Sequence, residues 1–423
     1  MADDPTGTHP AEPAAPEPLA SPQPGPPPGF AAIPVVFAIV ILATQGYLAL
    51  GRNFSNLLET PFLPYCLLGA FAIHMASRPS RAECLATFAL AIAAICWFVA
   101  LCGKFRPTTA YVVAAAGFSG LASLTVIAIQ VLRHRGQEQT GRLNTLLAGS
   151  VFGMSALIFA GVLEFTTRLH PQTYDLYLYF ADQGFGLPFC AWTGHFLAHR
   201  PALSRVCGLV YESLPLALSL LYAYQRGGSH PLPIRVLPAF LGGGLAVYLL
   251  YNILPAAGPL YIFGAAFPDH LPLSPGLHLA AIGSGARNAI PSMHVACVLL
   301  VFWNCRRISR WAYAAAGFYL ACTALACLGF GEHYLIDLVA GVPFALALQA
   351  VCAPATLRAL PEWKQSIAVG LALTLIWIAT VRFAVSLFHI PAFPWALSLV
   401  TLAVCALARR RMLPAEARYA ATP

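Results

Sequence analysis

The chain has 423 residues, of which 59% are hydrophobic and only 9% are charged. So few charges could not cover the surface of a water-soluble protein of this size, because such proteins carry roughly 25% charged residues. With a mean hydropathy of +0.71, the composition excludes a soluble globular enzyme, a disordered regulator and a disulfide-stapled secreted domain. It predicts an all-α fold, a polytopic transmembrane helical bundle.

Residues 1–29 are rich in Pro and Ala and are predicted to form a disordered tail. Apolar runs of about the ~20 residues that a bilayer requires follow it. Four accessory spans are expected in 30–143, six core spans in 144–355, and two spans with a basic tail in 356–423. These twelve spans are predicted at 31–50, 60–77, 84–102, 109–132, 144–163, 206–224, 236–256, 290–304, 311–330, 334–355, 366–388 and 391–408.

A further apolar stretch, 176–198, is interrupted by polar residues that include Asp182, His195 and His199. We interpret it as an interfacial or re-entrant helix that would roof a site. Within 206–224, Pro215 follows Glu212 closely and is expected to kink the helix.

The distribution of Arg predicts the topology. Net charge is +8, from 24 Lys and Arg against 16 Asp and Glu, and the Arg residues form no dense patch for nucleic acid. With twelve spans, all the clearest positive clusters fall on one side, which the positive-inside rule makes cytoplasmic, together with both termini. High Ala and Arg with scarce Lys suggest a bacterial inner-membrane protein. The clusters are Arg78–Arg81, Arg133–Arg142, Arg306–Arg310, Arg358–Lys364 and Arg409–Arg411.

The segment RNAIPSMHVA at 287–296 opens one predicted span. Pro291 suits the first turn of a helix, so His294 is expected near a helix N-terminus at the non-cytoplasmic border. Free backbone N–H groups at such an end favour an anion, especially phosphate. Ser292 adds a hydroxyl donor, and Arg287 would add a planar charged fork.

The segment GEHYLIDLVAG at 331–341 opens another span. His333 and Asp337 are four residues apart, so they share a helix face. A carboxylate there can fix the imidazole tautomer and leave the other ring nitrogen as a nucleophile or a base. A lone His at a helix end is usually a satisfied polar group. Here one intervening span returns both motifs to the same membrane face, and this pairing predicts a phosphoryl-transfer site.

The two motifs resemble those of the type-2 phosphatidic acid phosphatase superfamily, which also contains the vanadium haloperoxidases. The resemblance covers about 144–355 and is greatest to the branch that holds inositol-phosphorylceramide synthase. It implies that His333 is the nucleophile, Asp337 its orienting carboxylate and His294 the general acid. It implies no metal, nucleotide or other cofactor.

The superfamily's first motif corresponds to YNILPAAGP at 251–259, where Tyr251, Asn252, Gly258 and Pro259 would line the site or form an ordinary loop. Phosphatases of the superfamily carry a Lys and an Arg in this motif, and residues 250–262 contain neither. They also carry an Arg six residues before the nucleophile, where this chain has Cys327. These departures favour the transferase-like branch and leave Arg287 as the candidate phosphate ligand.

The sequence therefore predicts a multi-pass lipid phosphotransferase whose active site faces the non-cytoplasmic side. The donor would be a phospholipid or a polyprenyl phosphate, and the acceptor a lipid or an alcohol. Two alternatives remain at this point: a lipid phosphatase that uses water as the acceptor, and a transporter or scaffold without chemistry.

Overall fold

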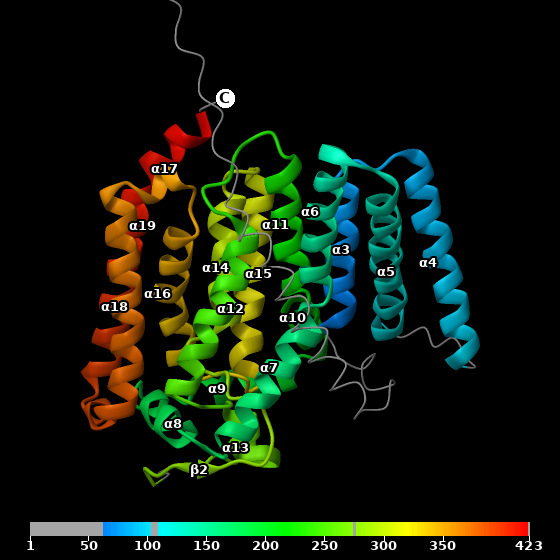
Figure 1. Cartoon of the computed structure of the whole chain (residues 1–423). Coiled ribbons are helices and arrows are strands. Elements are labelled where there is room, and N and C mark those ends of the chain that lie inside the picture. Colours follow the sequence, from blue (N-terminus) through cyan, green and yellow to red (C-terminus); the bar gives the residue numbers. More distant parts are fainter. Residues whose placement is uncertain (1–61, 103–108, 274–275, 422–423) are drawn as a thin grey trace, which may run out of the picture. The chain divides into compact units, whose positions relative to one another are not determined.

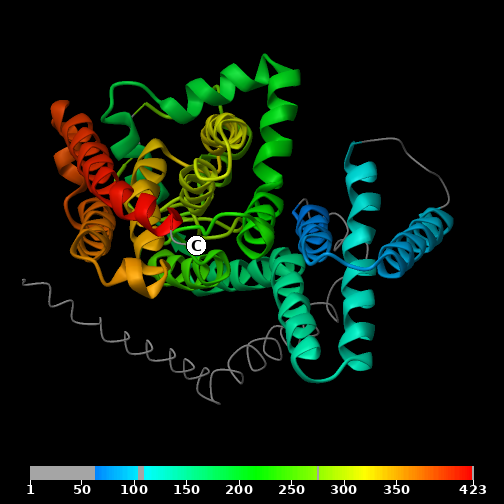
Figure 2. The ribbon, with the colours of Figure 1, turned by 90° about the horizontal axis from the view of Figure 1, so that it is seen from above.

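The computed structural model describes residues 62–102, 109–273 and 276–421, and these are helical almost throughout. The predicted disordered tail and the first predicted span, 31–50, lie outside the described residues. Apolar helices dominate the described part, which indicates a multi-pass membrane protein. Several helices of the blue, yellow and orange segments appear nearly end-on from above (Figure 2), so their axes run in similar directions.

Helices α5, α6 and α7 pack around α3, which also contacts α11, farther along the chain, while α4 packs against α5. Two of these contacts require glycine. A Cβ atom at Gly120 would lie 1.9 Å from the Leu67 carbonyl oxygen, and one at Gly69 would lie 2.2 Å from Ser219 Oγ. Small residues allow this close approach of helix backbones. The helices are α3 (Leu63–Ala76), α4 (Arg81–Cys102), α5 (Thr109–Arg133), α6 (Gly136–Gly153) and α7 (Ser155–Leu169).

The central helices bury the largest apolar cluster of the described residues, which includes Phe152, Phe240, Val298 and Phe344. Helix α14 packs against both α15 and α16, and α11 and α12 contact α14. The central helices are α10 (Pro201–Glu212), α11 (Leu214–Gly227), α12 (Val236–Ile253), α14 (Met293–Cys305), α15 (Arg310–Gly329) and α16 (Leu335–Val351).

Short elements cover one end of α12 and α14 (Figure 1). The stretch 176–198 forms most of two short helices, each far below the roughly 20 residues needed to cross a bilayer, and they pack beside α16 and α15. The elements are β1 (Gln172–Thr173), α8 (Asp175–Gln183), α9 (Phe189–Ala198), α13 (Pro259–Phe263), the 3₁₀ turn η2 (Gly264–Ala266) and β2 (Ala280–Ala281), which pairs antiparallel with β1.

The C-terminal helices pack on the outer side of α16. A Cβ atom at Gly370 would lie 2.6 Å from the Pro343 carbonyl oxygen, so α18 approaches α16 closely. Arg409 and Glu416 form a buried ion pair at 2.5 Å within α19. The elements are α17 (Ala355–Arg358), α18 (Pro361–Phe383), the 3₁₀ turn η3 (Val385–His389) and α19 (Ala392–Ala421).

Among the described residues, six helices are long and apolar enough to cross a membrane: α4, α5, α12, α15, α18 and α19. The number rises to eight if two bent pairs each count as one span: α6 with α7, bent by 47°, and α10 with α11, bent by 50°. The second bend falls at Ser213, just before Pro215, where the sequence predicts a kink. Helices α3, α14 and α16 are shorter apolar helices, so the count of twelve remains a prediction.

Candidate active site

The two histidine motifs meet at one end of the central helices. His294 lies in the first turn of α14 and His333 lies two residues before α16, and their ring centroids are 6.2 Å apart. The backbone N–H of Ser292 donates to the Asp337 carbonyl at 3.0 Å and joins the two motifs directly. Ser292 also caps α14, since its Oγ accepts from the Val295 N–H at 3.4 Å.

The His333 ring is held by a backbone carbonyl. Its Nδ1 lies 2.8 Å from the Ala289 oxygen and 3.5 Å from Asp337 Oδ2. A carbonyl oxygen can only accept, so Nδ1 carries the hydrogen and Nε2 of the neutral ring carries the lone pair. Nε2 lies 3.2 Å from Ser292 Oγ, whose hydroxyl can donate to it. In the neutral tautomer, the nitrogen with the lone pair is therefore Nε2, which lies beside Ser292 at the N-terminus of α14.

Asp337 is fully buried and performs a second task that the sequence spacing alone does not show. Its Oδ2 accepts from the Tyr334 N–H at 2.8 Å, which caps the first turn of α16. The tautomer of His333 is thus set mainly by Ala289, and Asp337 supplies a negative charge close to the ring.

His294 stacks on an aromatic residue that the sequence analysis did not single out. The rings of His294 and Tyr211 are 4.0 Å apart and inclined by 15°. Tyr211 comes from α10 and is 9% exposed. This contact holds the His294 ring in place between Tyr211 and His333. An aromatic residue inside an apolar span carries no local signal for such a role.

Two buried carboxylates of α8 fix the loops around the histidines. Asp175 Oδ1 accepts from the Gly258 N–H at 2.7 Å and from the Tyr334 hydroxyl at 3.1 Å. Asp182 Oδ1 accepts from the Leu335 N–H at 2.8 Å, at the start of α16. Burial is the main cause that raises the pKa of the Asp182 carboxyl to about 7; the Leu335 N–H opposes the rise and the nearby Asp337 charge adds to it. From the sequence, Asp182 is expected only as part of a roof over the site, and Asp175 carries no signal of its role.

Arg287 differs from its expected arrangement. Its side chain is fully buried, and four N–H contacts go to backbone carbonyls: Nε to His170 at 2.9 Å, NH1 to Ser284 at 3.0 Å and Gly285 at 2.7 Å, and NH2 to Ile282 at 2.7 Å. A guanidinium has five N–H donors. The Arg287 guanidinium, which was expected to hold phosphate, therefore donates to carbonyls of the loop 282–287 and fixes that loop.

The first-motif residues separate into two groups. Tyr251 donates to the Pro291 carbonyl at 3.3 Å and so supports the segment before His294. Gly258 has φ 112°, and a Cβ there would lie 2.5 Å from the Glu332 carbonyl oxygen; this conformation and contact require glycine. Pro259 begins α13 beside it. Asn252 instead bonds His170 Nε2 at 2.9 Å, next to the loop that Arg287 fixes.

Glu332 borders the site and bonds the Tyr261 hydroxyl at 3.3 Å. Burial raises the pKa of this carboxyl, and the neighbouring His333 and the Tyr261 contact oppose the rise. Within 62–102, 109–273 and 276–421, no three His, Cys, Asp or Glu side chains are arranged to hold a metal ion.

Comparison with known proteins gives a family match over part of the chain. Residues 176–351 match the family model described as the PAP2 superfamily, a segment that includes both histidines, Ser292, Asp337 and the first motif. The match supports the resemblance to the type-2 phosphatidic acid phosphatase superfamily. Members of this superfamily are generally phosphatases and phosphotransferases that act on lipid phosphates. No curated protein and no solved structure matches the chain.

Proposed function

We propose that this protein is a membrane phosphotransferase that moves a phosphoryl-bearing head group between lipids through a phosphohistidine. The observation that carries the proposal is the hydrogen bond from His333 Nδ1 to the Ala289 carbonyl at 2.8 Å. It leaves Nε2 with a lone pair, beside Ser292 and across from His294. A nucleophile oriented by one partner and faced by a proton donor is the arrangement that covalent catalysis requires.

The reaction would proceed in two displacements. His333 Nε2 attacks phosphorus, a P–N bond forms, and the P–O bond to the leaving lipid breaks while His294, in its protonated form, gives a proton to the departing oxygen. The acceptor then gives its proton back to His294 and attacks phosphorus, and the P–N bond breaks. Ser292 Oγ and the first N–H groups of α14 would contact the phosphoryl oxygens, because a helix N-terminus favours negative charge.

The basic residues that phosphatases of the superfamily carry are missing around His333, and this departure supports an acceptor other than water. Cys327, where phosphatases of the superfamily carry an Arg, is fully buried with its Sγ 3.9 Å from Ser292 Oγ. Residues 250–262 supply no Lys or Arg, and Arg287 is engaged by carbonyls. These departures support the proposed likeness to the inositol-phosphorylceramide synthase branch. A phosphatase is the alternative, while the approach of the two histidines favours an enzyme over a scaffold.

The donor is a phospholipid or polyprenyl phosphate, and the acceptor an alcohol or lipid such as a ceramide. The test is to incubate the purified protein in nanodiscs with labelled donor, with and without acceptor, and to identify the products. We expect labelled head group on the acceptor. Labelled free phosphate in the absence of acceptor would identify the phosphatase instead. If every donor returned unchanged under all conditions, the enzymatic proposal would be wrong.

A further inference from the structure

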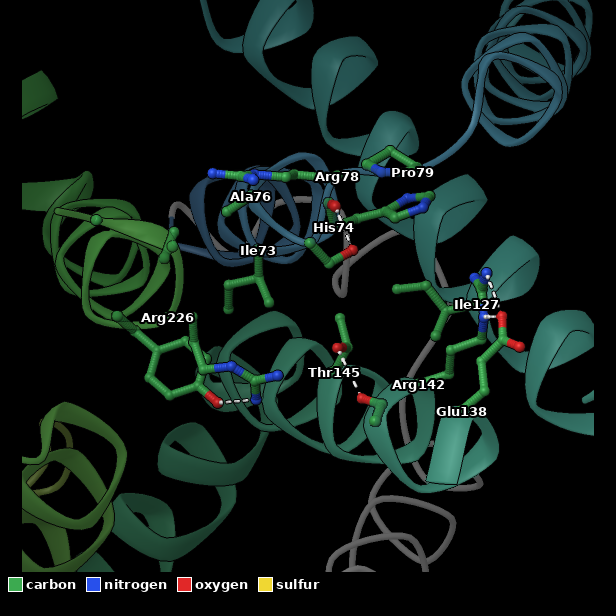
Figure 3. Close-up of a pocket in the computed structure, with 16 residues that line it drawn as sticks. Ile73, His74, Ala76, Arg78, Pro79, Ile127, Glu138, Arg142, Thr145 and Arg226 are labelled. Carbon is green, nitrogen blue, oxygen red and sulfur yellow. Dashed lines mark hydrogen bonds and ion pairs between the residues drawn. The ribbon is translucent and has the colours of Figure 1, made fainter. Parts of the chain in front are cut away.

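A polar cavity of about 580 Å³ lies among the ends of α3, α6 and α11, with α5 beside it (Figure 3). It is at the other end of the central helices from the histidines. Gln225, in the last turn of α11, bonds the Ile234 carbonyl, and the neighbouring Arg235 N–H donates to the carbonyl of Cys352, at the end of α16. Because His333 precedes the beginning of α16, the cavity and the candidate active site are separated by the length of that helix.

The cavity presents positive charge from separate walls. Arg78 follows α3 and Arg226 lies in α11, and both line it (Figure 3). Arg226 NH1 donates to the neutral Tyr222 hydroxyl at 3.4 Å. Neither guanidinium lies within ion-pair distance of a carboxylate of the described residues. A third arginine, Arg142, is already neutralised, by Glu83 at 2.5 Å and Glu138 at 3.3 Å.

A buried histidine on the same lining has an unsatisfied nitrogen. His74 is 2% exposed, and its Nδ1 has no hydrogen-bond partner among the described residues. Buried polar atoms nearly always have a partner, so such an atom on the wall of a cavity indicates that a ligand supplies one. As a donor, Nδ1 would suit an oxygen of an anion.

The position of the cavity also favours an anion. Arg78 and Arg142 belong to the Arg clusters that the sequence assigns to the cytoplasmic border, where lipid phosphates lie. Helices α3, α5 and α6 lie outside the segment 176–351 that matches the superfamily, whereas α11 lies inside it. The cavity therefore joins the flanking helices to the proposed catalytic core.

We propose that this cavity binds a phosphate-bearing anion, with Arg78 and Arg226 paired to the phosphate and His74 donating to one of its oxygens. Guanidinium groups bind phosphate through charge-assisted hydrogen bonds, which are among the strongest in proteins. The volume is within the range of ordinary small-molecule sites, about 300–1,000 Å³. The ligand is the head group of an anionic phospholipid or a soluble phosphate ester, and it occupies a site separate from the candidate active site.

The test compares the full chain with the double variant Arg78→Gln and Arg226→Gln. The matched control is Arg133→Gln with Arg135→Gln, which removes the same charge from exposed positions close to the start of α6. Binding is measured in phosphatidylcholine nanodiscs with and without phosphatidic acid, and separately by titration with inorganic phosphate and glycerol 3-phosphate. All proteins carry His333→Ala, so that turnover does not consume the probe and the outcome does not depend on the proposed catalysis.

We expect the double variant to bind the preferred probe about tenfold more weakly, as the loss of two charge-assisted pairs implies, and the control to bind like the parent. A response to phosphatidic acid alone identifies a lipid head group, and competition by glycerol 3-phosphate identifies a soluble ester. The single variants Arg78→Gln and Arg226→Gln, with a thermal unfolding measurement, serve if the double variant fails to fold. An equal loss of affinity in the double variant and the control would overturn the proposal. So would a parent protein that binds none of the phosphate probes in preference to phosphatidylcholine alone.

Discussion

At the scale of single residues, the different roles that we propose for the two histidines follow from their neighbours. His333 is fixed by a carbonyl that can only accept, so its reactive nitrogen stays unprotonated in the neutral ring. The His294 ring stacks on the face of Tyr211. Stacking positions the imidazole and, unlike a hydrogen bond in the ring plane, does not occupy either of its nitrogens. One histidine is thereby suited to attack and the other to exchange a proton.

Replacing His333 with Ala should lower the transfer rate by at least about 10³-fold, because no covalent intermediate can form. Replacing His294 with Ala should cost about 10²–10⁴-fold on lipid donors and much less on donors with good leaving groups, which need little protonation. Initial rates of product formation with both kinds of donor measure this difference. Normal turnover by the His333 variant would show that the nucleophile is assigned wrongly.

His294, Ser292, His333 and Asp337 could be predicted from sequence because each pair lies within one helical turn of a recognisable helix start. Ala289, Tyr211 and Asp175 could not, because their contacts depend on how distant segments fold together. Tyr211 is one aromatic residue among many in apolar spans. Arg287 is a further example. The sequence shows an arginine close to the motif, but it does not show that the carbonyls of the same loop surround its guanidinium group.

At the scale of elements, α8 fixes the start of α16. The N–H groups in the first turn of a helix lack partners within the helix, and here Asp182 and Asp337 satisfy those of Leu335 and Tyr334. The polar residues that interrupt 176–198 predict a stretch that does not span the membrane. They do not predict that the acidic residues face inward, because an Asp in such a stretch is ordinarily solvated.

The carboxyl of Asp182 should make stability depend on pH. Its pKa in the folded protein is raised to about 7, above the ordinary value, so the fold favours the neutral form. Neutral Asp182 makes its full contribution to the free energy of unfolding below the ordinary pKa of an aspartate, and this contribution is lost as pH rises through about 7. Between about pH 5 and pH 8 we expect the free energy of unfolding to fall by roughly 2 kcal/mol more in the parent than in Asp182→Asn. In the variant, the amide oxygen still accepts from the Leu335 N–H.

Thermal unfolding of the two proteins in the same detergent across this pH range measures the difference. Asp269→Asn is the control, because that carboxylate is largely exposed and bonds His195; its pH dependence should follow that of the parent. An Asp182→Asn curve parallel to the parent curve would show that Asp182 does not titrate with folding.

At the scale of the whole molecule, apolar runs predicted the class of protein well but the helix boundaries less well. A hydrophobic run reports burial in lipid, whereas a helix ends where caps and bends place it. The predicted span 144–163 is divided at Met154, where α6 meets α7, and the span predicted from 290 begins as α14 only after the Ser292 cap. Fewer helices are therefore long enough to cross a bilayer than there are apolar runs in the sequence.

The topology prediction depends on this count of spans. The segment 257–289 should lie on the non-cytoplasmic side, with both termini and the Arg clusters on the other side. Between Gly283 and Arg310 the structure contains a single apolar helix, α14, with the candidate active site at its beginning and the cluster Arg306–Arg310 at its end. The two ends of α14 should therefore face different compartments.

Reporter fusions placed after Gly283 and after Arg310 should accordingly give opposite signals with a pair of enzymes active on only one side of the membrane. The physical reason is that Arg residues beside a span are retained in the cytoplasm during insertion, which orients α14 with its histidine end outward. Fusions after Arg142 and after Arg358 should match the Arg310 fusion and serve as internal controls. Equal signals at Gly283 and Arg310 would mean that α14 does not cross the membrane. If both signals were cytoplasmic, the candidate active site would open to the cytoplasm, together with the cavity at Arg78 and Arg226.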